Sequence, residues 1–145
     1  MTEIHKKTEV PYSSDEMYSL VNNIEAYPEF LPWCTDANVS NANEHQLTAS
    51  VALEAGKIKQ TFTTENTMQP GKFIKMQLVK GPFKYLHGFW QFQPINNHAS
   101  TVSLDMEFEF KNKLLKLALN TTFNKIMDSL VSSFIKRAED VYGKR

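Results

Sequence analysis

Between Asn38 and Lys111 the sequence alternates apolar and polar residues with a period of two, and this alternation constrains the fold more than any other feature. A period of two is that of a β-strand with one buried face. Turn-forming dipeptides interrupt the alternation four times, at Gly56-Lys57, Pro70-Gly71, Gly81-Pro82 and Asn96-Asn97. The segment is therefore predicted to form a meander of antiparallel strands.

Beyond Asn112 the apolar period changes to that of an α-helix. Neither Pro nor Gly interrupts it before Gly143, which predicts a helix of about seven turns or more. The apolar stripe consists of Leu115, Leu119, Phe123, Ile126, Met127, Leu130, Phe134, Ala138 and Val141. Strands followed by a long amphipathic helix predict an α+β fold, in which a curved antiparallel sheet wraps around the helix.

The segment before the meander is predicted to hold one strand and two short helical stretches. Residues 3–10 alternate loosely and stop at Pro11, as a strand would. Ser13-Ser14 offers N-cap oxygens ahead of apolar residues at helical spacing. Pro28 and Pro32 bracket one further helical turn. That turn would bring together the side chains of a candidate lid, Tyr27, Phe30, Leu31 and Trp33.

Length and charge limit the class of protein. At 145 residues the chain is expected to form a single domain, residues 1–145, with one core. Sixteen Lys and Arg balance sixteen Asp and Glu, so any contact with nucleic acid or anionic lipid must come from a local patch. The single Cys34 excludes an internal disulfide framework. Without a signal peptide or a spanning apolar run, we expect a cytoplasmic protein with at most peripheral contact at the inner membrane.

A sheet curled around a helix leaves a cavity wherever the inward side chains do not fill the space. The chain has ten Phe and six Met, which suit an adaptable wall around a planar or prenylated ligand. The same residues would also make an ordinary hydrophobic core, and their spacing alone favours that simpler interpretation.

Several motifs, spread over nearly the whole chain, resemble the coenzyme-Q-binding branch of the START-like, polyketide-cyclase-related superfamily. They are Tyr18-Ser19-Leu20-Val21, Tyr27-Pro28-Glu29-Phe30-Leu31-Pro32-Trp33-Cys34, Gly81-Pro82-Phe83-Lys84-Tyr85-Leu86-His87-Gly88-Phe89-Trp90 and Phe134-Ile135-Lys136-Arg137-Ala138. The resemblance implies a helix-grip (START-like, SRPBCC) fold, in which the sheet wraps the C-terminal helix and leaves a deep apolar tunnel.

The resemblance implies two different activities. Mitochondrial relatives look like ubiquinone-binding chaperones needed for respiration, so the expected function is binding of ubiquinone or a similar prenylated lipid in support of respiratory electron transport. Ubiquinone is then a bound ligand, and no catalytic cofactor is expected. Bacterial relatives include a ribosome association toxin, which implies as the alternative a protein that binds the large ribosomal subunit and blocks subunit association. A small antitoxin protein would then be a further partner.

Each hypothesis has its candidate residues. The lipid hypothesis predicts a tunnel lined by Phe62, Met76, Leu78, Leu86, Trp90, Met106 and Phe108 on the sheet and by Phe123, Met127 and Leu130 on the helix. The lid residues Tyr27, Phe30, Leu31 and Trp33 would guard its entrance and touch a bilayer. The ribosome hypothesis uses Lys111, Lys113 and Lys116, which could bind RNA phosphates or lipid headgroups. A solvated helix face is the simpler interpretation of these lysines.

An enzyme of the cyclase or aromatase type is the third hypothesis, because the superfamily includes such enzymes. The predicted inward positions offer as polar groups only Gln60, Thr64 and Tyr85, which is little for acid and base catalysis. Cys34 has no local signature that joins it to a histidine, so we interpret it as a packing residue. We therefore expect a protein that is not an enzyme and has no catalytic residues.

The outward face of the last strand carries three carboxylates, Asp105, Glu107 and Glu109. Strand alternation places them toward solvent, and oxygen-ligand metal sites normally gather several loops, so no metal site is expected. His87 lies on the face opposite Trp90 and is expected at the surface or at the rim of the tunnel.

Overall fold

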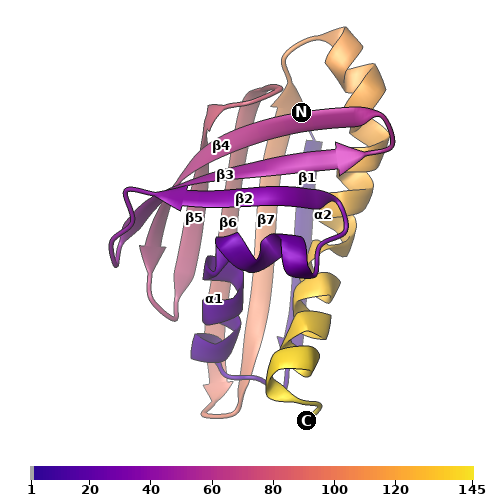
Figure 1. The fold of residues 1–145 in the computed structure, drawn as a ribbon. Helices are drawn as coiled ribbons and strands as arrows, with labels where there is room; N and C mark the ends of the chain where they lie inside the picture. The colour runs from indigo at the N-terminus through magenta and orange to yellow at the C-terminus, as the bar shows by residue number, and fades with distance from the viewer. Residues whose placement is uncertain (1) are drawn as a thin grey trace.

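The structure, a computed structural model, describes residues 2–145 as a seven-stranded antiparallel sheet curled around a long C-terminal helix (Figure 1). The elements in chain order are β1 (Thr2–Val10), α1 (Ser14–Asn22), the 3-10 helix η1 (Ile24–Glu29), β2 (Cys34–Ser40), β3 (Gln46–Ala55), β4 (Ile58–Gln69), β5 (Phe73–Lys80), β6 (Phe83–Asn96), β7 (Ala99–Phe110) and α2 (Lys113–Tyr142). Across the sheet the strand order is β1-β7-β6-β5-β4-β3-β2. The predicted α+β helix-grip fold is confirmed.

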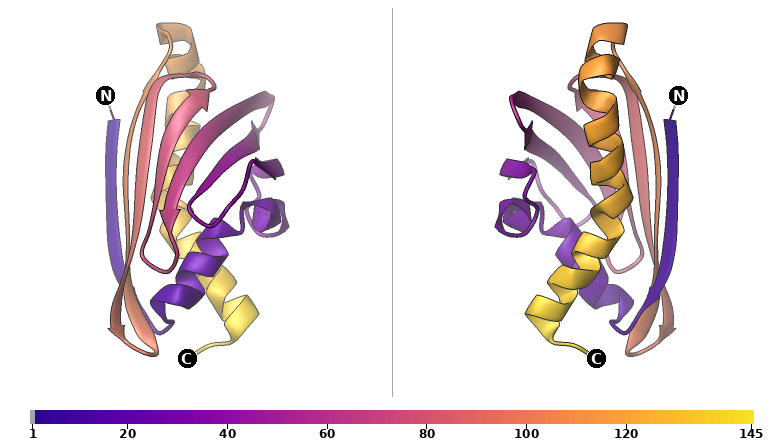
Figure 2. Two further views of the ribbon diagram at one scale, coloured as in Figure 1. Left: turned by 90° about the vertical axis from the view of Figure 1, so that its left-hand side faces the viewer. Right: turned by 90° about the vertical axis from the view of Figure 1, so that its right-hand side faces the viewer.

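The sheet is strongly curved, and α2 lies along its concave side. Figure 2 shows that β2, β3 and β4 turn away from the plane of β1, β7 and β6. The helix α1 packs against α2, β6 and β7, while η1 packs against β2. The two short N-terminal helices therefore cover the part of the concave side that α2 leaves open.

Local capping sets both ends of α2. The side chain of Asn112 accepts a hydrogen bond of 2.9 Å from the backbone N–H of Leu115. Gly143, at a φ of 87° that favours glycine, donates its N–H to the carbonyl of Glu139 and ends the helix. The buried stripe between these caps consists of Leu119, Phe123, Ile126, Met127, Leu130, Val131, Phe134 and Ala138.

Two details differ from the sequence prediction. The helical turn expected between Pro28 and Pro32 forms earlier, as η1, and the Phe30 N–H that follows it donates to the carbonyl of Tyr27. The alternation was expected from Asn38, but β2 already begins at Cys34 as an edge strand. A register shift between Cys34 and Asp36 breaks the period of two there, which hides this strand from pattern analysis.

Candidate ligand cavity

An apolar cavity of about 60 Å³ lies between the concave face of the sheet and α2, and α1 and η1 close it. Apart from Thr64, Asn66 and the hydroxyl of Tyr27, its lining is almost entirely hydrocarbon, ring and thioether. The lining residues are Val21, Ile24, Tyr27, Trp33, Ala49, Val51, Phe62, Thr64, Asn66, Ile74, Met76, Leu86, Trp90, Met106, Phe123, Met127, Leu130 and Phe134. This volume holds only a few water molecules.

Most of the predicted tunnel residues meet at this cavity, namely Phe62, Met76, Leu86, Trp90, Met106, Phe123, Met127 and Leu130. Two others do not line it. Leu78 is half-buried on β5 and packs against the core. Phe108 is fully buried, and its ring lies 4.7 Å from that of Phe123, so it fills space between sheet and helix instead of facing the cavity.

The candidate lid residues divide into three groups. Tyr27 and Trp33 line the cavity. Phe30 is half-buried outside it, with its ring 5.3 Å from that of Phe134 and under the Arg137 guanidinium at 4.8 Å. Leu31, expected at the entrance, is only 1% exposed and belongs to the core. Its N–H donates to the carbonyl of Tyr27, and this tight turn after η1 buries the side chain.

The hydroxyl of Tyr27 donates a hydrogen bond of 2.5 Å to the carbonyl of Val21 in α1. Burial raises the pKa of this phenol far above its ordinary value, so Tyr27 stays protonated. Its ring also lies 5.3 Å from that of Phe134 in α2. Tyr27 therefore joins η1 to both helices at the wall of the cavity.

A buried polar pair sits in the otherwise apolar wall. The hydroxyl of Thr64 donates a hydrogen bond of 2.7 Å to the side-chain oxygen of Asn66. Because this bond uses the amide oxygen, the two N–H donors of Asn66 remain available to a carbonyl oxygen inside the cavity. The sequence analysis named Thr64 but missed Asn66, although Phe62, Thr64 and Asn66 follow one another at the two-residue spacing of a single strand face.

Gly88 creates room in the wall for two flexible side chains. It pairs with Met76 on one side and with Met106 on the other. A Cβ at this position would overlap the Met76 methyl and lie 2.5 Å from the Met106 sulfur. The thioethers therefore occupy the space that a side chain at position 88 would need, and they make this part of the wall deformable.

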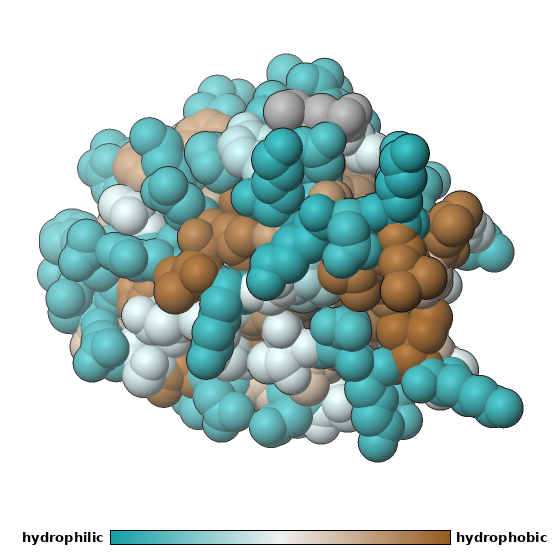
Figure 3. All heavy atoms as spheres, turned by 90° about the horizontal axis from the view of Figure 1, so that it is seen from above, coloured by the Kyte–Doolittle hydropathy of each residue, from teal (hydrophilic) through white to brown (hydrophobic). Residues whose placement is uncertain are grey.

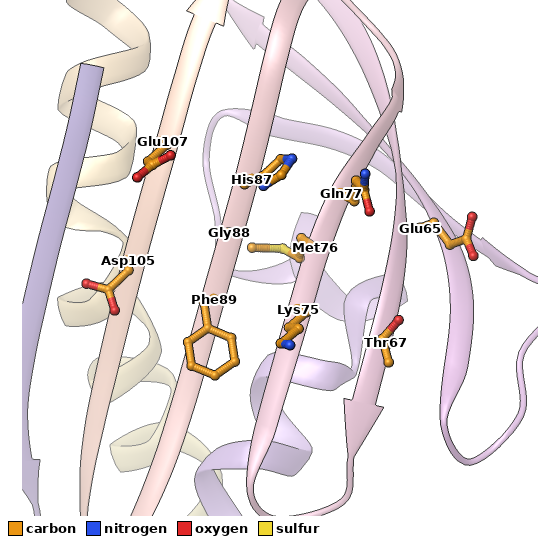
Figure 4. A pocket seen from close by; sticks show the side chains of 10 residues that line it. All are labelled: Glu65, Thr67, Lys75, Met76, Gln77, His87, Gly88, Phe89, Asp105 and Glu107. Atoms are coloured by element: carbon orange, nitrogen blue, oxygen red, sulfur yellow. The ribbon is translucent and has the colours of Figure 1, made fainter. Parts of the chain in front are cut away.

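The outer face of the sheet carries a larger and more polar groove of about 520 Å³ (Figure 4). Asp105, Glu107 and His87 line it, as the alternation predicts for outward residues. Tyr85, expected to point inward, instead donates to Glu107 at 2.6 Å and stacks on His87 at 4.5 Å. Its odd position on β6 places it on the outer face with His87. In residues 2–145, no three His, Cys, Asp or Glu side chains are grouped so that they could hold a metal ion.

Neither Cys34 nor Gln60 adds a reactive group to the cavity. Cys34 is 3% exposed, and burial raises the pKa of its thiol to about 11, so it is protonated at neutral pH. Gln60 lies outside the main cavity, beside a small void of about 10 Å³ near the beginning of α2.

The lysines expected to contact a ribosome or lipid headgroups lie away from the cavity. Lys111, Lys113 and Lys116 are exposed at the beginning of α2 and line a shallow groove of about 270 Å³. No helix formed within residues 2–145 is both long and apolar enough to span a membrane.

A curved antiparallel sheet that grips a C-terminal helix over an apolar cavity defines the helix-grip class of proteins. The chain belongs to the family described as polyketide cyclase / dehydrase and lipid transport, whose model matches residues 10–135. The aromatase/cyclase Zhui from Streptomyces sp. R1128 superposes with a TM-score of 0.83 at 10% identity, over 95% of this chain and 93% of Zhui. At that identity the similarity shows the fold alone.

Sequence relatives carry two kinds of name. The ribosome association toxin RatA of Escherichia coli K12 is 40% identical over 145 residues, which is all of this chain and 92% of RatA. The mitochondrial coenzyme Q-binding protein COQ10 of Dictyostelium discoideum is 24% identical over 139 residues, or 93% of this chain and 68% of COQ10. These names are of a toxin and a binding protein, whereas enzymes occur among the structural neighbours.

Proposed function

We propose that the protein binds ubiquinone or a similar prenylated quinone in the cavity and supports respiratory electron transport as a lipid carrier. The observation that carries this proposal is an apolar cavity whose wall contains the amide of Asn66. Hydrocarbon and aromatic side chains suit an isoprenoid tail, and the amide N–H groups suit a quinone carbonyl. The name and the 24% identity of COQ10 agree with this ligand class.

Binding requires the cavity to enlarge. Ligand sites typically measure about 300–1,000 Å³, well above the cavity's 60 Å³. Met76, Met106 and Met127 can change rotamer at low cost, and η1 is joined to the rest of the molecule mainly by side chains. Each methylene of the tail that leaves water contributes about 0.8 kcal/mol, so a few isoprene units offset the cost of opening and of ordering the ligand.

The test is organic extraction of the freshly purified protein, followed by mass spectrometry and by uptake of added ubiquinone. We expect close to one quinone per chain. Ala49→Leu fills the cavity and should lower uptake at least tenfold, because Ala49 is 3% exposed in its lining. Ala52→Leu, on the outer face of the same strand, is the matched control. An empty extract together with no uptake by the unaltered chain would overturn the proposal.

Binding to the large ribosomal subunit is the second candidate function, and the 40% identity to RatA over the whole chain favours it. Lys113 and Lys116 are exposed and would contact RNA phosphates. Lys113→Glu with Lys116→Glu should abolish co-sedimentation with large subunits at low salt, whereas Lys136→Glu, further along α2, should not. Binding that resists both the double change and added salt would exclude a phosphate contact at this position.

We propose that the protein has no catalytic activity. The polar groups in the cavity lining are Thr64, Asn66, the bonded hydroxyl of Tyr27 and the indole N–H groups of Trp33 and Trp90. None of these groups exchanges a proton near neutral pH. A cyclase would need an acid or a base beside its substrate. Turnover of a polyketide substrate by the purified protein would contradict this proposal.

A further inference from the structure

One end of the molecule carries an excess of positive charge, although the formal net charge of the whole chain is zero. This lysine-rich end consists of residues 54–59, 79–84 and 109–117, in three segments that contain two glutamates, Glu54 and Glu109. Seven lysines lie on the same segments, and all are exposed: Lys57, Lys59, Lys80, Lys84, Lys111, Lys113 and Lys116. Because the whole chain has a formal charge of zero, this end carries a local excess that the rest of the surface balances.

Tertiary structure brings the three segments together. The N–H of Lys111 donates to the carbonyl of Pro82 at 3.1 Å, which joins the β7–α2 connection to the β5–β6 turn. Lys84, Lys111 and Lys116 line the same shallow groove. The β3–β4 turn lies at the same end of the molecule, in the upper part of Figure 1.

Apolar side chains project from the same end. Leu114 is 77% exposed and Leu117 is 85% exposed, and their three-residue spacing places them on one side of the first turns of α2. Val79, in the adjoining segment, is 55% exposed. Figure 3 looks down onto this end and shows apolar surface next to long hydrophilic side chains. Exposed leucines are unremarkable singly, but a pair set among lysines forms an amphipathic surface.

We propose that the lysine-rich end is a docking surface for an anionic phospholipid bilayer, with Leu114 and Leu117 inserted between the headgroups. Lysines around an apolar tip match a negatively charged membrane surface, since their ammonium groups reach phosphates while their stems follow the acyl boundary. An RNA backbone would satisfy the lysines but would offer the leucines no apolar partner. The leucines therefore favour lipid.

The lysine-rich end lies close to the cavity, so a ligand could pass from a docked bilayer into it. The small void beside Gln60 lies under the lysine-rich end, between the β3–β4 hairpin and α2. Phe62 and Phe123 line both this void and the main cavity, with ring centroids 6.4 Å apart. Rotation of these two rings would join the spaces and open a path from the bilayer. This path, unlike docking itself, rests on the proposed quinone function.

Co-sedimentation with vesicles tests the docking. Vesicles of equimolar phosphatidylcholine and phosphatidylglycerol should bind the full chain, and phosphatidylcholine alone should bind it much more weakly. Leu114→Ser with Leu117→Ser should weaken binding about tenfold or more. Ile95→Ser is the matched control, because Ile95 is 50% exposed on the β6–β7 hairpin at the opposite end. Equal vesicle binding by the leucine variant and the unaltered chain would overturn the proposal.

Two further measurements separate the alternatives. The first compares the lysine and leucine variants. Suppose that Lys113→Glu with Lys116→Glu abolishes binding to large ribosomal subunits, while the leucine variant binds both vesicles and subunits as well as the unaltered chain does. The lysine-rich end then binds RNA, and the bilayer proposal is wrong. Quinone uptake from vesicles and from dilute aqueous solution distinguishes docking from ligand binding. A leucine variant that takes up quinone normally from solution but slowly from vesicles supports docking. If the unaltered chain takes up quinone from neither source and still binds vesicles, only the proposed quinone function is wrong.

Discussion

Thr64 and Asn66 form a hydrogen-bonded pair of 2.7 Å on the inward face of β4, where both side chains are at least 95% buried. The pair is the polar feature of a cavity wall that is otherwise built for hydrocarbon. An amide held in this way is pre-oriented, because its oxygen is already bonded and only its N–H groups can turn to a ligand. If the proposed quinone function holds, the pair links the stability of the sheet to the choice of ligand.

Replacing one member of this pair should lower the free energy of unfolding more than replacing both. Thr64→Val leaves the Asn66 oxygen buried without its donor, and should lower the free energy of unfolding by about 1–3 kcal/mol. Thr64→Val combined with Asn66→Leu removes both polar groups and should recover most of that loss, measured by urea denaturation. The double variant should still bind quinone less tightly than the unaltered chain. If the double variant is less stable than Thr64→Val, the two side chains do not depend on each other.

Gly88→Ala should reduce the cavity without unfolding the protein. The added Cβ meets the flexible ends of Met76 and Met106, which must move, and both side chains line the cavity. We expect a loss of about 1–2 kcal/mol in stability and a clear fall in quinone uptake. Gly56→Ala, in a turn where a Cβ meets nothing within 4 Å but φ is +62°, should cost about 1 kcal/mol and leave uptake unchanged. Equal uptake by both variants would exclude a role for the methionines.

The ion pair between Glu16 and Arg145 should make stability depend on pH. Arg145 donates to Glu16 at 2.7 and 2.9 Å, and this bond, helped by the Ser13 N–H, lowers the pKa of the carboxyl from 4.5 to about 2. A lowered pKa stabilises the fold above pH 4.5, and this contribution is lost as the pH falls toward 2. Glu16→Gln should therefore cost about 1–2 kcal/mol near neutrality, after allowance for solvent screening, and much less near pH 2.

The matched control is Glu25→Gln, in the first turn of η1, where the side chain is exposed. Chemical denaturation at a series of pH values gives both curves. A gap between the unaltered chain and Glu16→Gln that stays constant between pH 5 and pH 2 would contradict the assigned cause.

Cys34 should be unreactive in the folded protein. Its pKa of about 11 and its 3% exposure leave little accessible thiolate at pH 7. A disulfide reagent should react about a hundredfold or more slowly than with a free thiol, and quickly once urea unfolds the chain. As Cys34 is the single cysteine, the signal needs no control variant. Rapid reaction in native buffer would show that the segment between η1 and β2 opens readily.

The sequence predicts correctly those features of the structure that depend on neighbouring residues. The alternation of β7 predicts both of its faces, and its acidic residues do point outward. Asn112 and Gly143 bound α2 because one caps the first turn and the other adopts a conformation that favours glycine. The predicted positions of Leu31 and Tyr85 were wrong. A tight turn after η1 buries the first, and the second was assigned to the wrong face of β6.

The strand meander, the closing helix and the family follow from the amino-acid sequence alone, because periodicity, caps and motifs act over a few neighbouring residues. Which inward side chains face a cavity and which fill the core depends instead on how the sheet and α2 pack together. Phe108 and Phe123 are both inward and aromatic, yet only Phe123 lines the cavity, because sheet curvature and the position of α2 set the gap between them. The gathering of the lysines beside Leu114 and Leu117 likewise depends on chain segments that are distant in sequence and meet only in the fold.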